Sequence, residues 1–173
     1  MSKYLPRKDP HQQKPHGKTI EEKNESPEET ILSQKIVAEC LCLLGNTYMG
    51  DSYAYLKLDA RDRQLTNIEL ICCYQYLQFI NLTNNRLNNS QLKVLAKIPC
   101  VIVLEINNNY LESTAIPRLR FLQALIMKDN LIRTVEPFDH EHLGFIDLDN
   151  NKISYIDDLS FQRLPSLLKL SIC

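Results

Sequence analysis

LQFINLTNNRL, the stretch at residues 77–87, decides the fold of this 173-residue chain. It has leucine or isoleucine at its first, fourth, sixth and eleventh positions and asparagine at its ninth. Further copies of the pattern begin at Tyr53, Val101, Leu122, Leu143 and Leu167. The successive starts, from a degenerate first copy to an incomplete last one, are 24, 24, 21, 21 and 24 residues apart. Such regular spacing indicates stacked structural units.

The pattern is that of a leucine-rich repeat, in which each unit supplies one short strand and a return segment. Apolar side chains at the fourth and sixth positions alternate with polar ones, as they do in a strand with one buried face. A single unit cannot bury its own apolar face, so the units must stack. The predicted fold is therefore an α/β solenoid. It is a leucine-rich repeat horseshoe with a parallel β-sheet on its concave face, short helical or 3₁₀ segments on its convex face, and an N-terminal capping helix.

The ninth position of the repeat is predicted to be structural. It holds Asn85, Asn109, Asn130 and Asn151. An asparagine side chain can satisfy backbone groups that the turn after each strand would otherwise leave buried and unpaired, so we expect an asparagine ladder. The unit counted from Tyr53 instead has Arg61 at its ninth position and Arg63 at its eleventh. Because arginine is rarely buried without a partner, residues 53–76 are interpreted as part of an N-terminal cap.

Three segments are expected along the chain. Residues 1–27 are basic up to Lys18 and acidic after it, and we predict a disordered charged tail. Docking of this tail on an acidic surface such as tubulin or RNA is the alternative to a solvated tail. Residues 28–52 are assigned to a capping helix and linker, with Ser26 as N-cap and Gly45 as C-cap. Residues 53–173 form the leucine-rich repeat domain of about six repeats, the last incomplete.

The capping helix has apolar residues at helical spacing, and its apolar side is expected to cover the end of the first repeat. A partner-binding helix is the alternative. Among the return segments, residues 90–98 also have helical spacing, with Leu92, Leu95 and Ile98 facing inward and Ser90 as the cap. Residues 113–119 form a shorter segment that contains Pro117, which favours a 3₁₀ or extended conformation.

The charge and composition of the chain limit the classes of partner and the cell compartments that the sequence predicts. The chain has 20 basic and 21 acidic residues and a net charge of −1, which predicts neither a nucleic-acid partner nor a membrane partner. It has no long apolar run and no signal sequence, so we expect it in the cytosol or nucleus. The six cysteines lack the spacing of a zinc site and are predicted to be buried reduced thiols.

Two clusters have residue types that can carry chemistry. The first, His140-Glu141-His142, resembles a metal site but has no third ligand in view, so a solvated loop is favoured. The second is acidic and consists of Asp147, Asp149, Asp157 and Asp158. An open sheet offers these carboxylates no enclosed cleft that would shift their pKa values. We therefore expect no enzyme activity, no cofactor and no metal.

The concave face of the sheet is the surface that the repeat pattern defines. On each strand the third, fifth and seventh positions point away from the core. Four of the five residues in the third-position column are aromatic or branched apolar, which is typical of an interface core with polar columns beside it. Lateral packing across the sheet is the alternative. The predicted partner-binding residues are Tyr55, Phe79, Val103, Glu105, Ile126, Lys128, Phe145 and Asp147.

One part of the chain has a more specific resemblance. The stretches are Gly45-Asn46, AYLKL at 54–58, RDRQLTNI at 61–68 and YLQFINLTNNRL at 76–87. Together they resemble the opening of the leucine-rich repeat-containing protein 23 family, which are radial-spoke proteins of motile cilia. The resemblance implies a non-catalytic scaffold in the cytoplasm and cytoskeleton, at the radial spoke of the cilium or flagellum axoneme, with other spoke components as partners. It implies no catalytic residues.

Two further expectations follow. A regulatory subunit that binds a cytosolic or nuclear partner, such as a protein phosphatase, is the alternative to the spoke component. Members of the family are longer, whereas this chain stops within the predicted strand at residues 167–172. An exposed strand edge can pair with another chain, so self-association through the uncapped C-terminal edge is expected.

Overall fold

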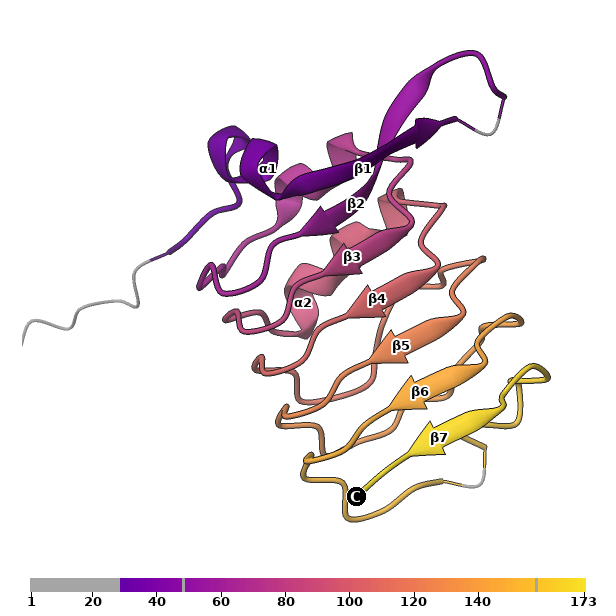
Figure 1. The fold of residues 1–173 in the computed structure, drawn as a ribbon. Helices are drawn as coiled ribbons and strands as arrows, with labels where there is room; N and C mark the ends of the chain where they lie inside the picture. Colours follow the sequence, from indigo (N-terminus) through magenta and orange to yellow (C-terminus); the bar gives the residue numbers. More distant parts are fainter. Residues whose placement is uncertain (1–28, 48, 158) are drawn as a thin grey trace, which may run out of the picture.

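The computed structural model describes residues 29–47, 49–157 and 159–173. Its elements in chain order are α1 (Gln34–Cys40), β1 (Leu41–Asn46), β2 (Tyr53–Asp59), the 3₁₀ helix η1 (Glu69–Cys73), β3 (Phe79–Asn81), α2 (Asn89–Leu92), the 3₁₀ helix η2 (Lys93–Lys97), β4 (Val103–Glu105), β5 (Ala124–Ile126), β6 (Phe145–Asp147) and β7 (Lys169–Ser171). Together the strands form one seven-stranded sheet in the order β1 to β7 (Figure 1). The predicted charged tail, residues 1–27, lies outside the described residues.

Parallel pairing runs from β2 to β7, and each strand lies beside the strand of the next repeat. The sheet forms one wall of the solenoid and the return segments form the other (Figure 1). Between the two walls lie the fourth-position side chains, including Ile80, Leu104, Leu125 and Ile146, all of which are buried. The sequence prediction of a leucine-rich repeat solenoid is confirmed.

In the described part of the chain, the convex side carries helices only over the first two return segments. Residues 89–97 form α2 and η2, and Leu92, Leu95 and Ile98 are fully buried, as predicted. Ser90 is not the cap. Asn88 caps this helix, because its side chain accepts the N–H of Ser90 and forms a capping box with Gln91. The segment at 113–119 is extended and forms a parallel bridge from Ser113 to Thr134, in agreement with its short length.

The N-terminal cap differs from the prediction. Helix α1 begins after Ser33, which is its N-cap, and ends at Cys40; Ser26 and Pro27 lie outside the described residues. The predicted continuation to Gly45 is wrong, because Leu41–Asn46 form β1 and pair antiparallel with β2. The hairpin satisfies backbone groups on the outer edge of β2 that a helix would leave unpaired. Gly45 is therefore no helix cap: a Cβ at this position would lie 2.5 Å from Cδ1 of Leu56 across the hairpin.

The first repeat starts two residues later than the sequence alignment placed it. Lys57 lies beside Phe79, and Leu58 lies beside Ile80, so Leu58 occupies the fourth position. With the start at residue 55, the fourth, sixth and eleventh positions are Leu58, Ala60 and Leu65, all fully buried. Its ninth position is then Arg63 rather than Arg61.

Arg63 connects the cap to the first repeat. Its guanidinium Nη1 lies 3.0 Å from a carboxylate oxygen of Glu39 on α1. The arginine is exposed in this arrangement, so it needs no buried partner. Where the later repeats have an asparagine facing the preceding unit, the first repeat has an ion pair facing the helix.

No helix in the described part of the chain has the length and apolar character needed to cross a membrane.

Candidate protein-binding face

The concave face is built by strand geometry. Residues two apart on a strand point to the same side of the sheet, and the strand register aligns the same repeat positions on neighbouring strands. The third positions of β3 to β6 are Phe79, Val103, Ala124 and Phe145. These four residues, here called the apolar stripe, are all partly exposed. The sheet therefore presents a continuous apolar row across four strands.

Tyr55 does not belong to the apolar stripe. It lies opposite Leu44 in the β1–β2 hairpin and is 45% exposed. Lys57 occupies the third position on β2, beside Phe79. The sequence pattern placed the first repeat two residues too early, because Leu56 and Leu58 are both apolar and either can match the fourth position. The sixth position, Ala60, is too small to stand out as an apolar repeat position.

Cations border both ends of the apolar stripe. Lys57 stands at the β2 end, and Lys169 occupies the same position on β7. The Lys169 ammonium lies 5.3 Å from the centroid of the Phe145 ring, a cation–π distance. The Lys169 ammonium thus lies over the ring of Phe145, whereas Phe79 has no such contact among the described residues.

The fifth-position column beside the apolar stripe is mostly polar. It consists of Asp59, Asn81, Glu105, Ile126, Asp147 and Ser171. Arg61 binds Asp59 through two hydrogen bonds of 2.7 and 2.9 Å, and these hold the pKa of the Asp59 carboxyl below its usual range. Lys128 lies 3.9 Å from Asp147 and 4.0 Å from Asp149, which are longer contacts.

Glu105 has a different environment from the other two carboxylates. Its Oε2 accepts a hydrogen bond of 2.6 Å from the Asn81 side-chain amide. Within the described residues no cation lies within 4 Å of this carboxylate. Glu105 also borders a small hollow of about 80 Å³ on the concave face, which Phe79, Val103 and Lys57 help to line. This hollow combines an apolar floor with one acidic and one basic side chain at its border.

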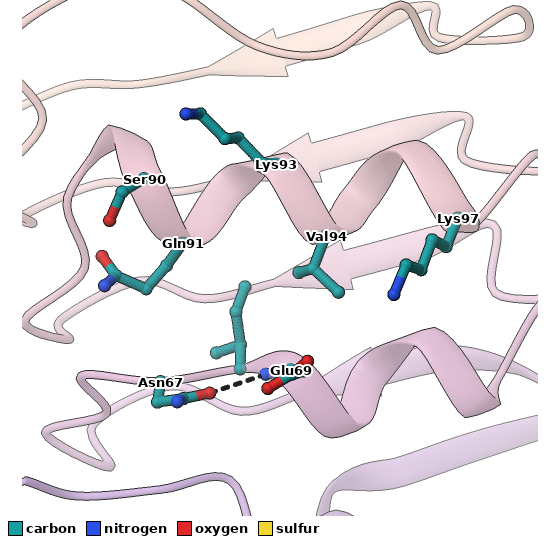
Figure 2. Close-up of a pocket in the computed structure, with 8 residues that line it drawn as sticks. Asn67, Glu69, Ser90, Gln91, Lys93, Val94 and Lys97 are labelled. Carbon is teal, nitrogen blue, oxygen red and sulfur yellow. Dashed lines mark hydrogen bonds between the residues drawn. The ribbon is translucent and has the colours of Figure 1, made fainter.

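A wider groove lies on the convex side, between η1 and the α2–η2 helix (Figure 2). Its volume is about 370 Å³, and seven of its lining side chains are labelled in Figure 2. Most of them are polar or charged, such as Lys93 and Lys97, and Asn67 accepts the backbone N–H of Glu69 at 2.9 Å. The repeat pattern does not predict this groove, because it forms where the return segments of two neighbouring repeats pack side by side, and the pattern defines only the strand positions. It lacks the apolar row that the concave face provides.

The ninth-position asparagines bridge neighbouring repeats. Asn130 makes the fullest set of contacts: its amide donates to three backbone carbonyls, and its oxygen accepts two backbone N–H groups. The acceptors are the carbonyl oxygens of Ile106, Met127 and Lys128 at 2.9, 3.1 and 3.0 Å, and the donors are the N–H groups of Asn109 and Leu111 at 3.1 and 3.2 Å. Asn85, Asn109 and Asn151 also donate to carbonyls of the preceding repeat. Each asparagine thus joins its own turn to the repeat before it.

A second polar row lies at the eighth position and was not found from the sequence. It consists of Asp62, Asn84, Asn108, Asp129 and Asn150, all of which have positive φ between 48° and 58°. Asparagine and aspartate tolerate this left-handed conformation better than other residues with a side chain. Side-chain hydrogen bonds of 2.6, 2.8 and 2.9 Å join Asn84 to Asp62, Asn108 to Asn84, and Asn150 to Asp129. The signal was present as an Asn or Asp before each ninth position.

The predicted solvated loop at His140-Glu141-His142 is wrong for its first residue. His140 is buried, and its Nε2 lies 3.3 Å from both the Leu119 N–H and the Pro117 carbonyl oxygen. Its Nδ1 has no partner among the described residues. Burial lowers the pKa of His140 below 6.5. The histidine therefore has a packing role, while His142 is exposed.

The cysteines are less buried than predicted. Cys40 is buried, and this burial raises the pKa of its thiol. Cys42, Cys73 and Cys173 are exposed; Cys42 lies on the edge strand β1, and Cys73 lies at the end of η1. All six are free thiols. In the described ranges no three His, Cys, Asp or Glu side chains are grouped so that they could hold a metal ion.

Known proteins resemble this chain in sequence. Leucine-rich repeat-containing protein 23 of Bos taurus is 32% identical over 83% of this chain and 41% of the relative. The protein of the same name in Mus musculus is 30% identical over 91% of this chain and 46% of the relative. The chain thus spans less than half the length of these curated relatives. No protein-family model matches the sequence.

The fold also has a counterpart among solved structures. Internalin C2 from Listeria monocytogenes superposes with a TM-score of 0.55 over 68% of this chain and 50% of that protein, at 23% sequence identity. At this identity the likeness bears on the fold alone. Because the repeat pattern, the parallel sheet and the curated relatives agree, the chain is a leucine-rich repeat protein of the protein-binding scaffold class, and it resembles leucine-rich repeat-containing protein 23.

Proposed function

We propose that this chain is a non-catalytic structural component of the axonemal radial spoke that supports ciliary or flagellar motility. The resemblance of residues 45–87 to the leucine-rich repeat-containing protein 23 family supports this assignment, as does the similarity over most of the chain to relatives of that name. The proposal places the protein in the cytoplasm, in the cytoskeleton of the cilium axoneme, with other spoke components as its partners.

The apolar stripe is the observation that favours binding through the concave face. Phe79, Val103, Ala124 and Phe145 are only partly buried, although they form a continuous row across β3 to β6 on a mostly polar surface. Aligned apolar side chains with a polar border are typical of an interface core and its rim. Concave faces of solenoids commonly bind partners, and aromatic residues are frequent hot spots.

Two experiments test the axonemal location and the concave binding face separately: localisation of a tagged chain and co-purification of its partners. A tagged chain expressed in ciliated cells should be found along the axoneme, and spoke components should co-purify with it. The double substitution Phe79→Ala and Phe145→Ala should reduce that recovery at least tenfold while the protein remains folded. Tyr110→Ala is the matched control, because Tyr110 is exposed outside the third, fifth and seventh positions of the strands.

Three outcomes would contradict this assignment. A diffuse distribution in ciliated cells would overturn the axonemal role. Co-purification with a protein phosphatase from cells that lack cilia would instead support the regulatory alternative. Full recovery of spoke components with the folded double variant would exclude the apolar stripe as the binding surface.

A further inference from the structure

The charges beside the apolar stripe indicate what kind of partner segment this face fits. Of the three carboxylates in the fifth-position column, Asp59 is already bound by Arg61 through two short hydrogen bonds. Glu105 has no cation within 4 Å among the described residues, and Lys128 reaches Asp147 only at 3.9 Å. Glu105 is therefore open to a basic group supplied by a partner, whereas at Asp147 such a group would compete with Lys128.

The spacing of these two carboxylates suits a helix. Glu105 lies on β4 and Asp147 on β6, so two inter-strand steps of about 4.8 Å, or roughly 9.6 Å, separate them. Residues seven apart in an α-helix are separated by about 10.5 Å along the axis. A helix that crosses the strands would therefore place two basic residues, seven positions apart, opposite Glu105 and Asp147.

The apolar positions fit the same helix. Successive members of the apolar stripe are about 4.8 Å apart, close to the helical pitch of about 5.4 Å. Same-side residues of an extended segment repeat every 6.6 to 6.8 Å by the usual strand rise of about 3.3 Å, which matches less well. Ile126 lies between Glu105 and Asp147 in the fifth-position column, where the helix would present an apolar residue between its two cations.

We propose that the concave face binds a basic amphipathic helix lying across β3 to β6, with its apolar side on the apolar stripe and two lysines or arginines on Glu105 and Asp147. This inference rests on the proposed function of the concave face and specifies its partner. Complementary charge fixes the register of such a helix, and the apolar stripe supplies the contact area.

Selection of peptides on the full chain tests the proposal. A phage-displayed library of helical peptides is selected on immobilised protein, and an enriched sequence is synthesised and measured by fluorescence anisotropy. Enriched peptides should have two basic residues seven positions apart on an amphipathic helix. Their affinity should fall about tenfold or more for Glu105→Gln and for Asp147→Asn, as expected for the loss of a charge-assisted contact, and should weaken with added salt.

Conservative variants keep the test interpretable. Gln at position 105 retains an oxygen that can accept the Asn81 amide, and Asn at 147 retains the acceptor for the Asp149 N–H, so both proteins should melt like the unmodified chain. Glu112→Gln is the matched control, since Glu112 is exposed and its side chain lies outside the concave columns. This control should leave the affinity unchanged.

The possible failures are distinguishable. Enriched peptides that lack basic residues, that bind without helical circular dichroism, or that bind Glu105→Gln and Asp147→Asn undiminished would overturn the basic helix. If those peptides nevertheless lose affinity for the Phe79→Ala and Phe145→Ala protein, binding by the concave face stands. Enriched peptides that are insensitive to both aromatic substitutions would contradict the concave face itself.

Discussion

At the scale of single residues, the polar side chains decide how the repeats join. The ninth-position asparagines were predictable, because a polar residue recurring within an apolar pattern implies buried backbone groups that need a partner. The role of Arg63 was not predictable, since its partner Glu39 lies 24 residues away on a helix whose end the sequence misplaced. Local patterns predict contacts between equivalent positions, but they do not predict the contacts of a terminal cap.

Asn130→Ala should lower the free energy of unfolding by about 1–3 kcal/mol. The substitution removes the amide and oxygen that together satisfy five backbone groups around two turns. Urea denaturation measures the effect, with Lys152→Ala as the exposed control. A midpoint for Asn130→Ala equal to that of the control would show that water or neighbouring groups replace the asparagine fully.

His140 should make the stability of the fold depend on pH. Its pKa is lowered in the folded protein, so between pH 6.5 and that lower value the unfolded chain binds more protons. The His140 contribution is therefore constant above this window, and the folded state loses stability as pH falls through it. The physical reason is that burial removes the charged imidazolium from water, and a proton on Nδ1 would have no acceptor among the described groups.

Urea denaturation at pH 7.5 and pH 5.5 measures this dependence. His140→Gln should show a smaller difference between the two pH values than the unmodified chain, while His142→Gln, at an exposed position, should not alter it. An unchanged difference in His140→Gln would mean that other groups account for the pH dependence.

At the scale of elements, the sequence periodicity was sufficient to place the strands wherever a repeat has a neighbour on both sides. The strands from β3 to β6 fall at the predicted positions, because every fourth-position side chain there is covered by the next repeat. The cap was predicted less well. The apolar residues between Ile31 and Leu44 recur at helical spacing, yet the edge of β2 favours a strand over the second half of this segment. Tertiary pairing overrides the local preference there.

Leu104→Ala or Leu125→Ala should each destabilise the array by about 2–5 kcal/mol, the usual cost of truncating a buried leucine. Both side chains are fully buried between neighbouring repeats, so little space can collapse around the cavity. Leu159→Ala is the control, because Leu159 is 56% exposed. Thermal or urea denaturation that gave the three variants equal stability would be inconsistent with the register of β4 and β5.

At the scale of the whole molecule, the sheet of the described residues ends in two edge strands of different character, β1 and β7. The stacking of the repeats was predictable, because each unit needs a neighbour to bury its apolar face. The position of the concave side chains was predictable from β3 onward but not at β2, where a two-residue error moved Tyr55 into the apolar stripe in place of Lys57. A two-residue error in a strand keeps each side chain on the same face of the sheet and only assigns it to the wrong repeat position. Hydropathy alone therefore cannot detect such an error.

The strand β7 is the site at which this chain should self-associate. Leu170, at the fourth position, is 39% exposed, whereas Ile146 at the same position on β6 is fully buried. One edge of β7 pairs with β6, and among the described residues no strand pairs with its other edge, which lies beside this apolar side chain. Sedimentation velocity of the 173-residue chain should therefore show a mass that rises with concentration, and Leu170→Lys should reduce that association by placing a charge at the edge.

The opposite end of the sheet supplies the matched comparison. β1 is also an edge strand, and its Leu43 and Leu44 are 54% and 59% exposed, so an apolar edge exists there as well. Leu44→Lys adds the same charge at that end and should leave the association unchanged. If Leu44→Lys abolished the association while Leu170→Lys did not, the chains would meet through the N-terminal hairpin, because a charge weakens an interface only where it becomes buried.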